Sequence, residues 1–312
     1  MDSMTNFAVY GQGCELNFAG LMDRWQTEAA ARLKRSTVST YAGIATRHIR
    51  PALGGLPAGQ VDQARAAGLI GGMNEAGLSP GTVRLTASVL QSILDYRAQC
   101  GILGQPVKVS RPSRDTPEAR FLSAAEQAAL EKYLLGHMSR ENLGVYLCLY
   151  SGLREGEICA LRWEDIDLAA GTLSVRRTVQ RICSGGSSEL VVGAPKSRAS
   201  RRTIPLTASA LRLAKAMAGP PESYVVTGTE KPMEPRSAQN RFKRVLVKAG
   251  IADANFHALR HSFATRCIER GFDVKTLSLI LGHADVSTTL NVYVHPSVER
   301  MRKCMALLDK KV

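Results

Sequence analysis

The chain has 312 residues, which is enough for two domains with sizeable cores. Its 41 Lys and Arg outnumber 27 Asp and Glu, and the net charge of +14 favours a polyanionic partner. The seven Cys form no C-x-x-C pair, and neither a signal-peptide core nor an apolar run of about 18 residues is present. These features argue against the disulfide-rich and membrane-spanning classes, and we expect a cytoplasmic protein with free thiols.

Four helices and no strand are predicted in the first hundred residues. Ser36 or Thr37 is expected to begin the second helix, while Ser79 caps the fourth and Pro80 takes its first position. The predicted ranges are 15–33, 37–50, a short helix from Asp62, and 80–99. Residues 1–104 are therefore interpreted as a small helical domain. This format is common among DNA-binding domains, and also among many others.

Residues 105–120 are predicted to form an extended linker, because they contain three prolines, several charges and little periodicity. Helical patterns resume in a second domain, 121–312. Its predicted helices are 123–135, 142–150, 155–162, 236–249, 256–270, 274–281, 286–294 and 298–309. Its predicted strands are 171–182, 189–195, 201–206 and 224–228. The predicted fold class is mainly α with a small β-sheet (α+β).

The segment SGLREGEICALRWEDID (151–167) places an arginine where a helix begins. Gly152 ends the preceding helix, so Arg154 lies at the N-terminus of the next one, where the helix dipole disfavours a cation. An arginine is favoured there if an anion fills the space, because a guanidinium and free N–H groups together bind phosphate. Glu157 is expected to support the guanidinium. The alternative is a surface arginine paired with a glutamate.

The predicted strand pair is rich in basic residues. Between 176 and 202 a single acid, Glu189, stands against Arg176, Arg177, Arg181, Lys196, Arg198, Arg201 and Arg202. Like charges repel across strands, so this hairpin suits contact with a phosphate backbone better than a solvated face. Lys196 lies in the predicted turn APKSR, where its ammonium could reach a scissile phosphate. The alternative is an ordinary solvated turn residue.

The segment ANFHALRHSFATRC (254–267) is predicted to project a histidine and an arginine from one helical face. His257 and Arg260 are three residues apart, close to the N-terminal end of the helix. Beside them runs a predicted core stripe of Phe256, Leu259, Phe263 and Cys267. Two polar groups on one turn indicate an anion site; the alternative for His257 is a satisfied structural histidine.

In the segment LGHADVSTTLNVYVHPS (281–297), Gly282 is predicted to end a helix, which leaves His283 in the turn. Tyr293 then lies near the C-terminal end of the following helix. The alternative is that Tyr293 is one more core residue on a helical stripe with Val286 and Leu290.

Two Arg, one Lys, two His and one Tyr together fit phosphodiester transesterification. Two guanidiniums match the charge that the phosphoryl transition state spreads over its oxygens. A Tyr hydroxyl can attack phosphorus, a Lys can protonate the departing 5′-oxygen, and His residues can bind phosphate or assist proton transfer. The sequence has no G-x-x-x-x-G-K-[ST] loop, H-E-x-x-H motif or zinc spacing, so neither a cofactor nor a metal is expected.

At these residues the chain resembles the tyrosine recombinases, also called phage-type integrases, over nearly its whole length. SGLREGEICALRWEDID is similar to the family's first Arg box, HALRHSFAT to its H-x-x-R box, and LGHADVSTTLNVY to its box from His to the nucleophile. Some members have nine residues in the last interval, whereas this chain has ten. The resemblance implies that Arg154 and Arg260 hold the scissile phosphate, with Glu157 as a supporting acid. It implies that Lys196 is the general acid and Tyr293 the nucleophile. His257 and His283 would bind phosphate and transfer protons.

The resemblance also implies an activity and partners. The expected enzyme is a site-specific recombinase that cuts and rejoins DNA through 3′-phosphotyrosyl and Holliday-junction intermediates, to integrate or excise a mobile element. Expected partners are double-stranded DNA with core sites, three further copies in a homotetramer, and an accessory directionality factor. The C-terminal helix would be exchanged between copies; docking in cis is the alternative. An arm-binding domain is not evident, which suggests a Xer-like architecture, and the DNA-bound protein would be nucleoid-associated.

Three other functions are weighed against this one. A type IB topoisomerase shares the chemistry but only relaxes supercoils, and the compact LGH box and the tail helix favour the recombinase. A DNA-binding regulator without catalysis would leave Tyr293, His283 and Lys196 without a purpose. A metal-dependent nuclease would need paired carboxylates at a suitable spacing, which the sequence lacks.

Overall fold

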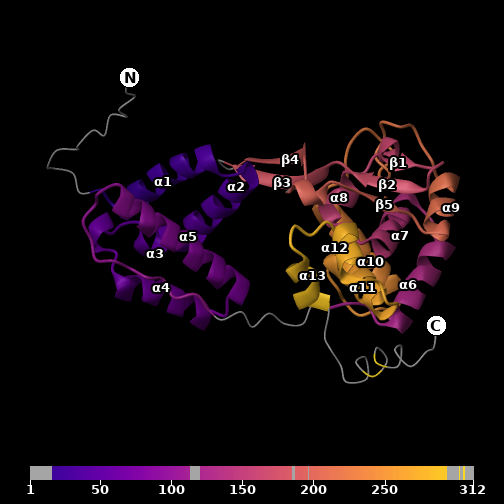
Figure 1. The fold of residues 1–312 in the computed structure, drawn as a ribbon. Helices are drawn as coiled ribbons and strands as arrows, with labels where there is room; N and C mark the ends of the chain where they lie inside the picture. Colours follow the sequence, from indigo (N-terminus) through magenta and orange to yellow (C-terminus); the bar gives the residue numbers. More distant parts are fainter. Residues whose placement is uncertain are drawn as a thin grey trace. The chain divides into compact units, whose positions relative to one another are not determined.

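A computed structural model of the chain describes residues 16–112, 120–184, 187–195, 197–293, 302 and 305. The chain divides into two compact units (Figure 1). Unit 1 comprises Met1–Thr116 with Ile182–Ser187, and unit 2 comprises Pro117–Arg181 with Ser188–Val312. The predicted fold class is confirmed, because the described residues form many helices and two small sheets. Within those residues no helix is both long enough and apolar enough to cross a membrane.

Unit 1 consists of helices around one apolar core. The elements are α1 (Phe18–Arg32), α2 (Arg35–Ile44), a π-helix η1 (Ala45–Ile49), α3 (Arg50–Leu53), a 3₁₀ turn η2 (Ala58–Gln60), α4 (Gln63–Glu75) and α5 (Pro80–Gln99). The predicted cap at Ser79 is confirmed, since its hydroxyl accepts from the Thr82 N–H at 3.3 Å. The core is built by side chains such as Phe18, Leu21 and Leu90, all fully buried.

Residues 37–50 are helical, as predicted, but the helix begins earlier and is not regular throughout. The helical segment begins at Arg35 and passes through the π-helix η1 before α3. Pro51 explains the wider turn: it has no N–H to donate, and its ring would clash with the Arg47 carbonyl of a regular α-helix.

Residues 105–112 have no helix or strand and pack within unit 1. The side-chain amide of Gln63 donates to the Lys108 carbonyl and accepts from the Lys108 N–H, both at 3.0 Å. Gln91 accepts from the Val109 N–H at 2.8 Å, and the Val109 side chain is buried. These two amides replace the partner strand that an extended segment would otherwise need.

Unit 2 contains most of the described helices, the three-stranded sheet, and the parts of β3 and β4 outside Ile182–Ser187. Its helices are α6 (Ala124–Gly136), α7 (Arg140–Ser151), α8 (Glu155–Cys159), α9 (Ala208–Ala216), α10 (Pro235–Lys248), α11 (His257–Glu269), α12 (Val274–Leu281) and α13 (Val286–Tyr293), with 3₁₀ turns η3 (Trp163–Asp165) and η4 (Arg198–Ser200). The strands β1 (Ile166–Asp167), β2 (Thr172–Val175) and β5 (Arg202–Pro205) form an antiparallel sheet in the order β1-β2-β5. Leu173 lies opposite Ile204, and both are buried in the helical core. Figure 1 shows this sheet beside the helices of unit 2.

The predicted strand 171–182 is split between two sheets. β2 ends at Val175, and β3 (Thr178–Ser184) pairs instead with β4 (Ser187–Gly193). The break falls at Arg177, whose guanidinium turns to bind the Asp165 carboxylate at 2.9 Å. The single hairpin predicted from the sequence was therefore wrong.

The predicted strand 224–228 is a turn. The Gly228 N–H donates to the Tyr224 carbonyl at 2.7 Å, and the Tyr224 N–H donates to the Thr229 carbonyl at 2.8 Å. Gly228 has a φ of +68°, which a strand residue does not adopt. Only Tyr224 forms a bridge, with Arg162.

Two glycine turns set the geometry of the site. Gly152 ends α7 with a φ of +64°, and Gly282 ends α12 with a φ of +66°, as predicted. A Cβ on Gly152 would lie 2.6 Å from the ring of Phe263 in α11. These close approaches bring the start of α8 and the end of α12 against α11.

Candidate active site

Arg260 on α11 is buried at the centre of the candidate site. Its Nη1 donates to the Gly152 carbonyl at 2.7 Å, and its Nη2 donates to the Leu281 carbonyl at 2.8 Å. The same Nη2 lies 2.7 Å from Nε2 of His283. The side chain is 1% exposed, and burial, followed by the charges of Arg154 and Arg202, lowers its pKa to about 9. Arg260 thus stays charged at neutral pH, with neutral partners that leave its charge uncompensated.

Arg154 is the N-cap of α8, as its predicted place at a helix start requires. Its Nη1 donates to Glu157 at 2.8 Å, which bears out the expected support, and its Nη2 donates to the Gly282 carbonyl at 3.0 Å. About a third of the Arg154 side chain is exposed, whereas the Glu157 side chain is buried. Burial opposes ionisation of Glu157, but Arg202 and then Arg154 outweigh it and lower the pKa of the carboxyl.

His283 follows the Gly282 turn, and its two ring nitrogens have different partners. Nε2 faces the Arg260 guanidinium, which can only donate, so Nε2 accepts and Nδ1 carries the proton. Nδ1 then donates to the hydroxyl of Thr289 at 2.8 Å, and Thr289 is fully buried. Burial and the charges of Arg260, Arg154 and Arg202 lower the pKa of His283 to about 4. The ring is neutral at pH 7.

His257 lies exposed at the first position of α11. Partial desolvation, then His261, Arg260 and Arg154, lower its pKa to about 4. Its ring meets that of His261 edge-on, with centroids 4.6 Å apart. The predicted common face of His257 and Arg260 is only partly correct, because Arg260 turns inward while His257 stays at the surface.

Tyr293 lies in the last turn of α13 and is buried against this cluster. Its side chain is 9% exposed, and its ring centroid is 5.5 Å from that of His261. Burial raises the pKa of Tyr293, while Arg260 and Arg154 act in the opposite direction. The predicted stripe was wrong: Leu290 is 43% exposed, and Thr289 takes the buried place one turn before Tyr293. Tyr293 thus packs in a hydrophobic cluster with Phe263 and Leu281, and it also faces the polar groups of the site.

No role was predicted for His261, Thr289 or Ser200. His261 is one helical turn after His257, and its Nδ1 is buried without a partner among the described residues. Ser200 lies 3.5 Å from Nη1 of Arg154. The spacing of His257 and His261, one helical turn apart, could have predicted that the two rings meet. The contacts of Thr289 and Ser200 with the site depend on the tertiary fold, and no sequence pattern predicts them.

The basic residues predicted to bind DNA separate into different environments. Arg176 and Arg201 are exposed, and they line a hollow of about 560 Å³ on the β2–β5 face. Arg177 and Arg181 bind the carboxylates of Glu164, Asp165 and Glu234. The Arg202 side chain is only 6% exposed, so its predicted place on a DNA-facing surface was wrong. Lys196 and the side chain of Arg198 lie outside the described part of the chain, as does the predicted tail helix apart from Arg302 and Met305.

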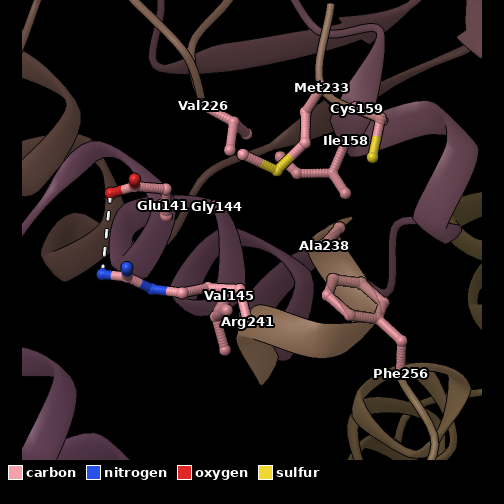
Figure 2. A pocket seen from close by; sticks show the side chains of 10 residues that line it. All are labelled: Glu141, Gly144, Val145, Ile158, Cys159, Val226, Met233, Ala238, Arg241 and Phe256. Atoms are coloured by element: carbon pink, nitrogen blue, oxygen red, sulfur yellow. Dashed lines mark ion pairs between the residues drawn. The ribbon is translucent and has the colours of Figure 1, made fainter. Parts of the chain in front are cut away.

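The described residues offer no group of three His, Cys, Asp or Glu side chains that could hold a metal ion. Figure 2 shows a cavity between α7, α8 and α10, beside the ion pair of Glu141 and Arg241. Its volume is about 10 Å³, which is room for about one water molecule. This cavity is a packing defect of the core and not a ligand pocket.

Comparison with known proteins identifies the class of this fold and site. The sequence profile of the Phage integrase family matches residues 142–300, slightly over half of the chain. The chain therefore belongs to the phage integrase family, and it is a tyrosine recombinase, a site-specific recombinase that acts on DNA.

Relatives match over most of their lengths. The chain is 26% identical to a tyrosine recombinase XerC-like protein of Caldanaerobacter subterraneus subsp. tengcongensis, over 90% of this chain and 80% of that protein. It is 28% identical to tyrosine recombinase XerC of Xanthomonas axonopodis pv. citri, over 97% of this chain and 95% of that protein.

Solved structures share the fold. The Tn1549 transposon integrase, in complex with transposon right end DNA, aligns with a TM-score of 0.78 and 21% identity, over 94% of this chain and all of that one. A lambda integrase tetramer bound to a Holliday junction aligns with a TM-score of 0.67 and 19% identity, over 91% of this chain and 80% of that one.

Proposed function

We propose that this recombinase cuts and rejoins DNA strands through a 3′-phosphotyrosyl bond at Tyr293. The observation that carries the proposal is the position of Tyr293. It is buried against a cluster in which Arg260 has only neutral partners and Arg154 shares one carboxylate with a second arginine. Such excess positive charge stabilises a site once a phosphate enters it.

The chemical step exchanges one ester for another. The Tyr293 Oη attacks the scissile phosphorus, the Oη–P bond forms, and the bond from phosphorus to the 5′-oxygen breaks. Lys196 protonates the leaving 5′-oxygen, and the hydroxyl proton of Tyr293 passes to a neutral histidine or to water. The raised pKa of Tyr293 means that the resting site holds the phenol and not the phenolate. A 5′-hydroxyl from a second strand reverses the step, so no external energy source is required.

The neutral histidines suit this chemistry. With pKa values near 4 in the free protein, His257 and His283 can each accept a proton at pH 7. A bound phosphodiester monoanion raises both pKa values, because it favours the protonated rings. His283 would then exchange its contact with Arg260 for the phosphate.

In this proposal residues 1–104 and residues 121–312 both bind duplex DNA, and the linker 105–120 joins them. The exposed Arg176 and Arg201 contact the phosphate backbone through the basic hollow on the β2–β5 face. Strand exchange passes through a Holliday junction, and the biological task is integration or excision of a mobile element. The likeness to a transposon integrase and to a tetramer on a Holliday junction supports these finer assignments.

Four copies act together in this proposal, each donating its tail helix to a neighbour. A groove of about 470 Å³ on unit 2 fits an amphipathic helix, because it combines apolar and charged side chains. Its lining includes Ala128, Glu131, Phe263, Arg266, Cys267 and Phe272. The tail offers Val298, Met301, Met305 and Leu308 at helical spacing.

A nicked duplex built from the DNA that flanks the gene tests the proposal. Cleavage releases a short fragment, which traps the enzyme on the DNA, and a denaturant-resistant adduct is expected with the native chain but not with Tyr293→Phe. A second duplex that shares the core site should be joined to the first. Relaxation of supercoils without joining would identify a topoisomerase, and binding without an adduct would identify a non-catalytic DNA-binding protein.

A further inference from the structure

Arg202 begins β5, yet its side chain turns into the candidate site. Its Nη1 and Nη2 donate to the two carboxylate oxygens of Glu157, at 3.0 and 2.9 Å. Its Nε donates to the Ile280 carbonyl at 2.5 Å, and its Nη1 also donates to the Ser200 carbonyl at 3.0 Å. All three nitrogens of the guanidinium are therefore occupied by protein acceptors, and the side chain is 6% exposed.

The three partners of Arg202 belong to three of the segments that carry, or lie beside, the proposed catalytic residues. Glu157 lies on α8, which begins at Arg154. Ile280 lies in the last turn of α12, just before the turn that holds His283. Ser200 ends η4, on the loop that follows Lys196. One planar guanidinium thus joins segments that are far apart in the chain, and its fixed fork holds them at defined angles.

Arg202 also changes the charge balance at Arg154. Glu157 accepts from the Arg154 Nη1 at 2.8 Å and from its backbone N–H at 2.9 Å, and it serves Arg202 with the same two oxygens. One negative charge is therefore shared by two guanidiniums. The pair Arg154 and Glu157 alone would be close to neutral, but with Arg202 one positive charge remains for an incoming phosphate.

The turn before His283 is fitted against the Arg202 side chain. A Cβ on Gly282 would lie 2.9 Å from Cδ and 3.0 Å from Nη1 of Arg202. Glycine is needed there both for its φ of +66° and for this close approach. The Gly282 carbonyl in turn accepts from Arg154.

We propose that Arg202 is a positioning residue for strand cleavage: it holds Glu157, the His283 turn and the loop after Lys196 so that Arg154 and His283 converge on the scissile phosphate. Arg202 itself does not touch DNA. This inference rests on the proposed recombinase chemistry and adds a residue to it. A substitution should consequently slow the chemical step and leave DNA affinity unchanged.

The test measures single-turnover adduct formation at saturating nicked duplex, together with the Kd for the same duplex and the thermal unfolding midpoint. Arg202→Met is expected to slow adduct formation about 10- to 100-fold, because small misplacements of catalytic groups have effects of this size. Its Kd should stay within about twofold of the native value. Arg212→Met, an exposed arginine of α9, is the matched control and should change neither quantity.

A neutral scissile group separates positioning from mere loss of structure. A duplex with a methylphosphonate at the cleavage position carries no charge for Arg154 to match, so the defect of Arg202→Met should shrink at least severalfold on this duplex. A general loss of folded protein would lower adduct formation equally on both duplexes. If Arg202→Met does not fold, Arg202→Lys keeps one charge without the fork, and it should show the same pattern with a smaller defect.

Four outcomes would overturn the inference. They are an unchanged adduct rate, a weaker Kd with a normal rate at saturation, equal defects on the two duplexes, and a reduced active fraction that reacts at the native rate. Failure of the native chain to form any adduct would instead refute the proposed function. The two failures are therefore distinguishable in one experiment.

Discussion

Two groups of arginines in unit 2 have contrasting partners. Beside and on β3, Arg177 binds two carboxylates and Arg181 binds Glu234. At the site, Arg260 binds two carbonyls and a neutral histidine, although it is far more deeply buried. The more exposed charges are thus largely neutralised by neighbours, whereas the buried charge is held in place without being cancelled.

This difference teaches that partners, and not the number of basic residues, determine which region can receive an anion. A buried guanidinium without a carboxylate is costly, and carbonyl acceptors only partly offset the cost. Among the described residues of unit 2, that cost falls on Arg260, beside Tyr293, where a phosphate would relieve it. The strand arginines contribute a general field that attracts DNA.

Among the variants that test this comparison, Arg260→Lys is expected to have the largest effect on adduct formation. A lysine cannot span the two carbonyls and His283 at once, so adduct formation should fall by about 10³-fold while the protein still binds the duplex. Single-turnover adduct rates and a binding titration on the same preparation measure the two effects. A rate within about threefold of the native value would remove Arg260 from the centre of the site.

Glu157→Gln sharpens the comparison by removing the one carboxylate shared by Arg154 and Arg202. Breaking this buried network should lower the free energy of unfolding by about 3 kcal/mol and slow adduct formation. Urea unfolding measures the first effect. The matched change Glu234→Gln breaks the more exposed pair with Arg181 and should cost only about 1 kcal/mol or less. Equal losses for the two variants would contradict the contrast between the regions.

The stability of the free protein should fall in acid because of the histidines. Folded His257 and His283 have pKa values of about 4, below the ordinary 6.5, so between these values the unfolded chain binds protons that the folded chain does not. The two neutral histidines therefore do not lower the free energy of unfolding above pH 6.5, and they lower it progressively as the pH falls toward 4. The unfolding midpoint should drop by several degrees over this range, and less so in a double variant with both residues changed to Asn. An equally steep drop in that variant would refute the assignment.

Arg176→Ala is expected to have the smallest effect. Its side chain is 62% exposed and lies 3.7 Å from Asp165, so it can contribute one phosphate contact. DNA affinity should weaken modestly, and the slope of log K against log salt should decrease by about one. The adduct rate at saturating DNA should not change. A slower chemical step would place Arg176 in the active site and contradict the distinction between the two groups of arginines.

Local signals in the sequence predicted most of the fold and part of the site. Caps and glycines located the helix ends at Ser79, Gly152 and Gly282, because these signals act within one turn. The spacing of Arg154 and Glu157 predicted their contact for the same reason. These are interactions between near neighbours in the chain.

Long-range packing explains what the sequence did not predict. Arg202 sits in a strand pattern that looks solvent-facing, and only its contacts with α8 and α12 reveal that it is buried. Leu290 fits an apolar stripe, yet the fully buried Thr289 binds His283 instead. In both cases a side chain or carbonyl group outside the residue's own helical turn or strand determines whether the side chain is buried.

The central claim is that Tyr293 becomes covalently bound to DNA. Mass spectrometry of the trapped adduct, after digestion with trypsin and nuclease, tests it most directly. The expected peptide covers residues 276–300, and Tyr293 is its single tyrosine. A nucleotide-derived mass on Tyr293, absent from Tyr293→Phe, is the predicted result. The same mass on any other residue, or an adduct that persists in Tyr293→Phe, would contradict the account.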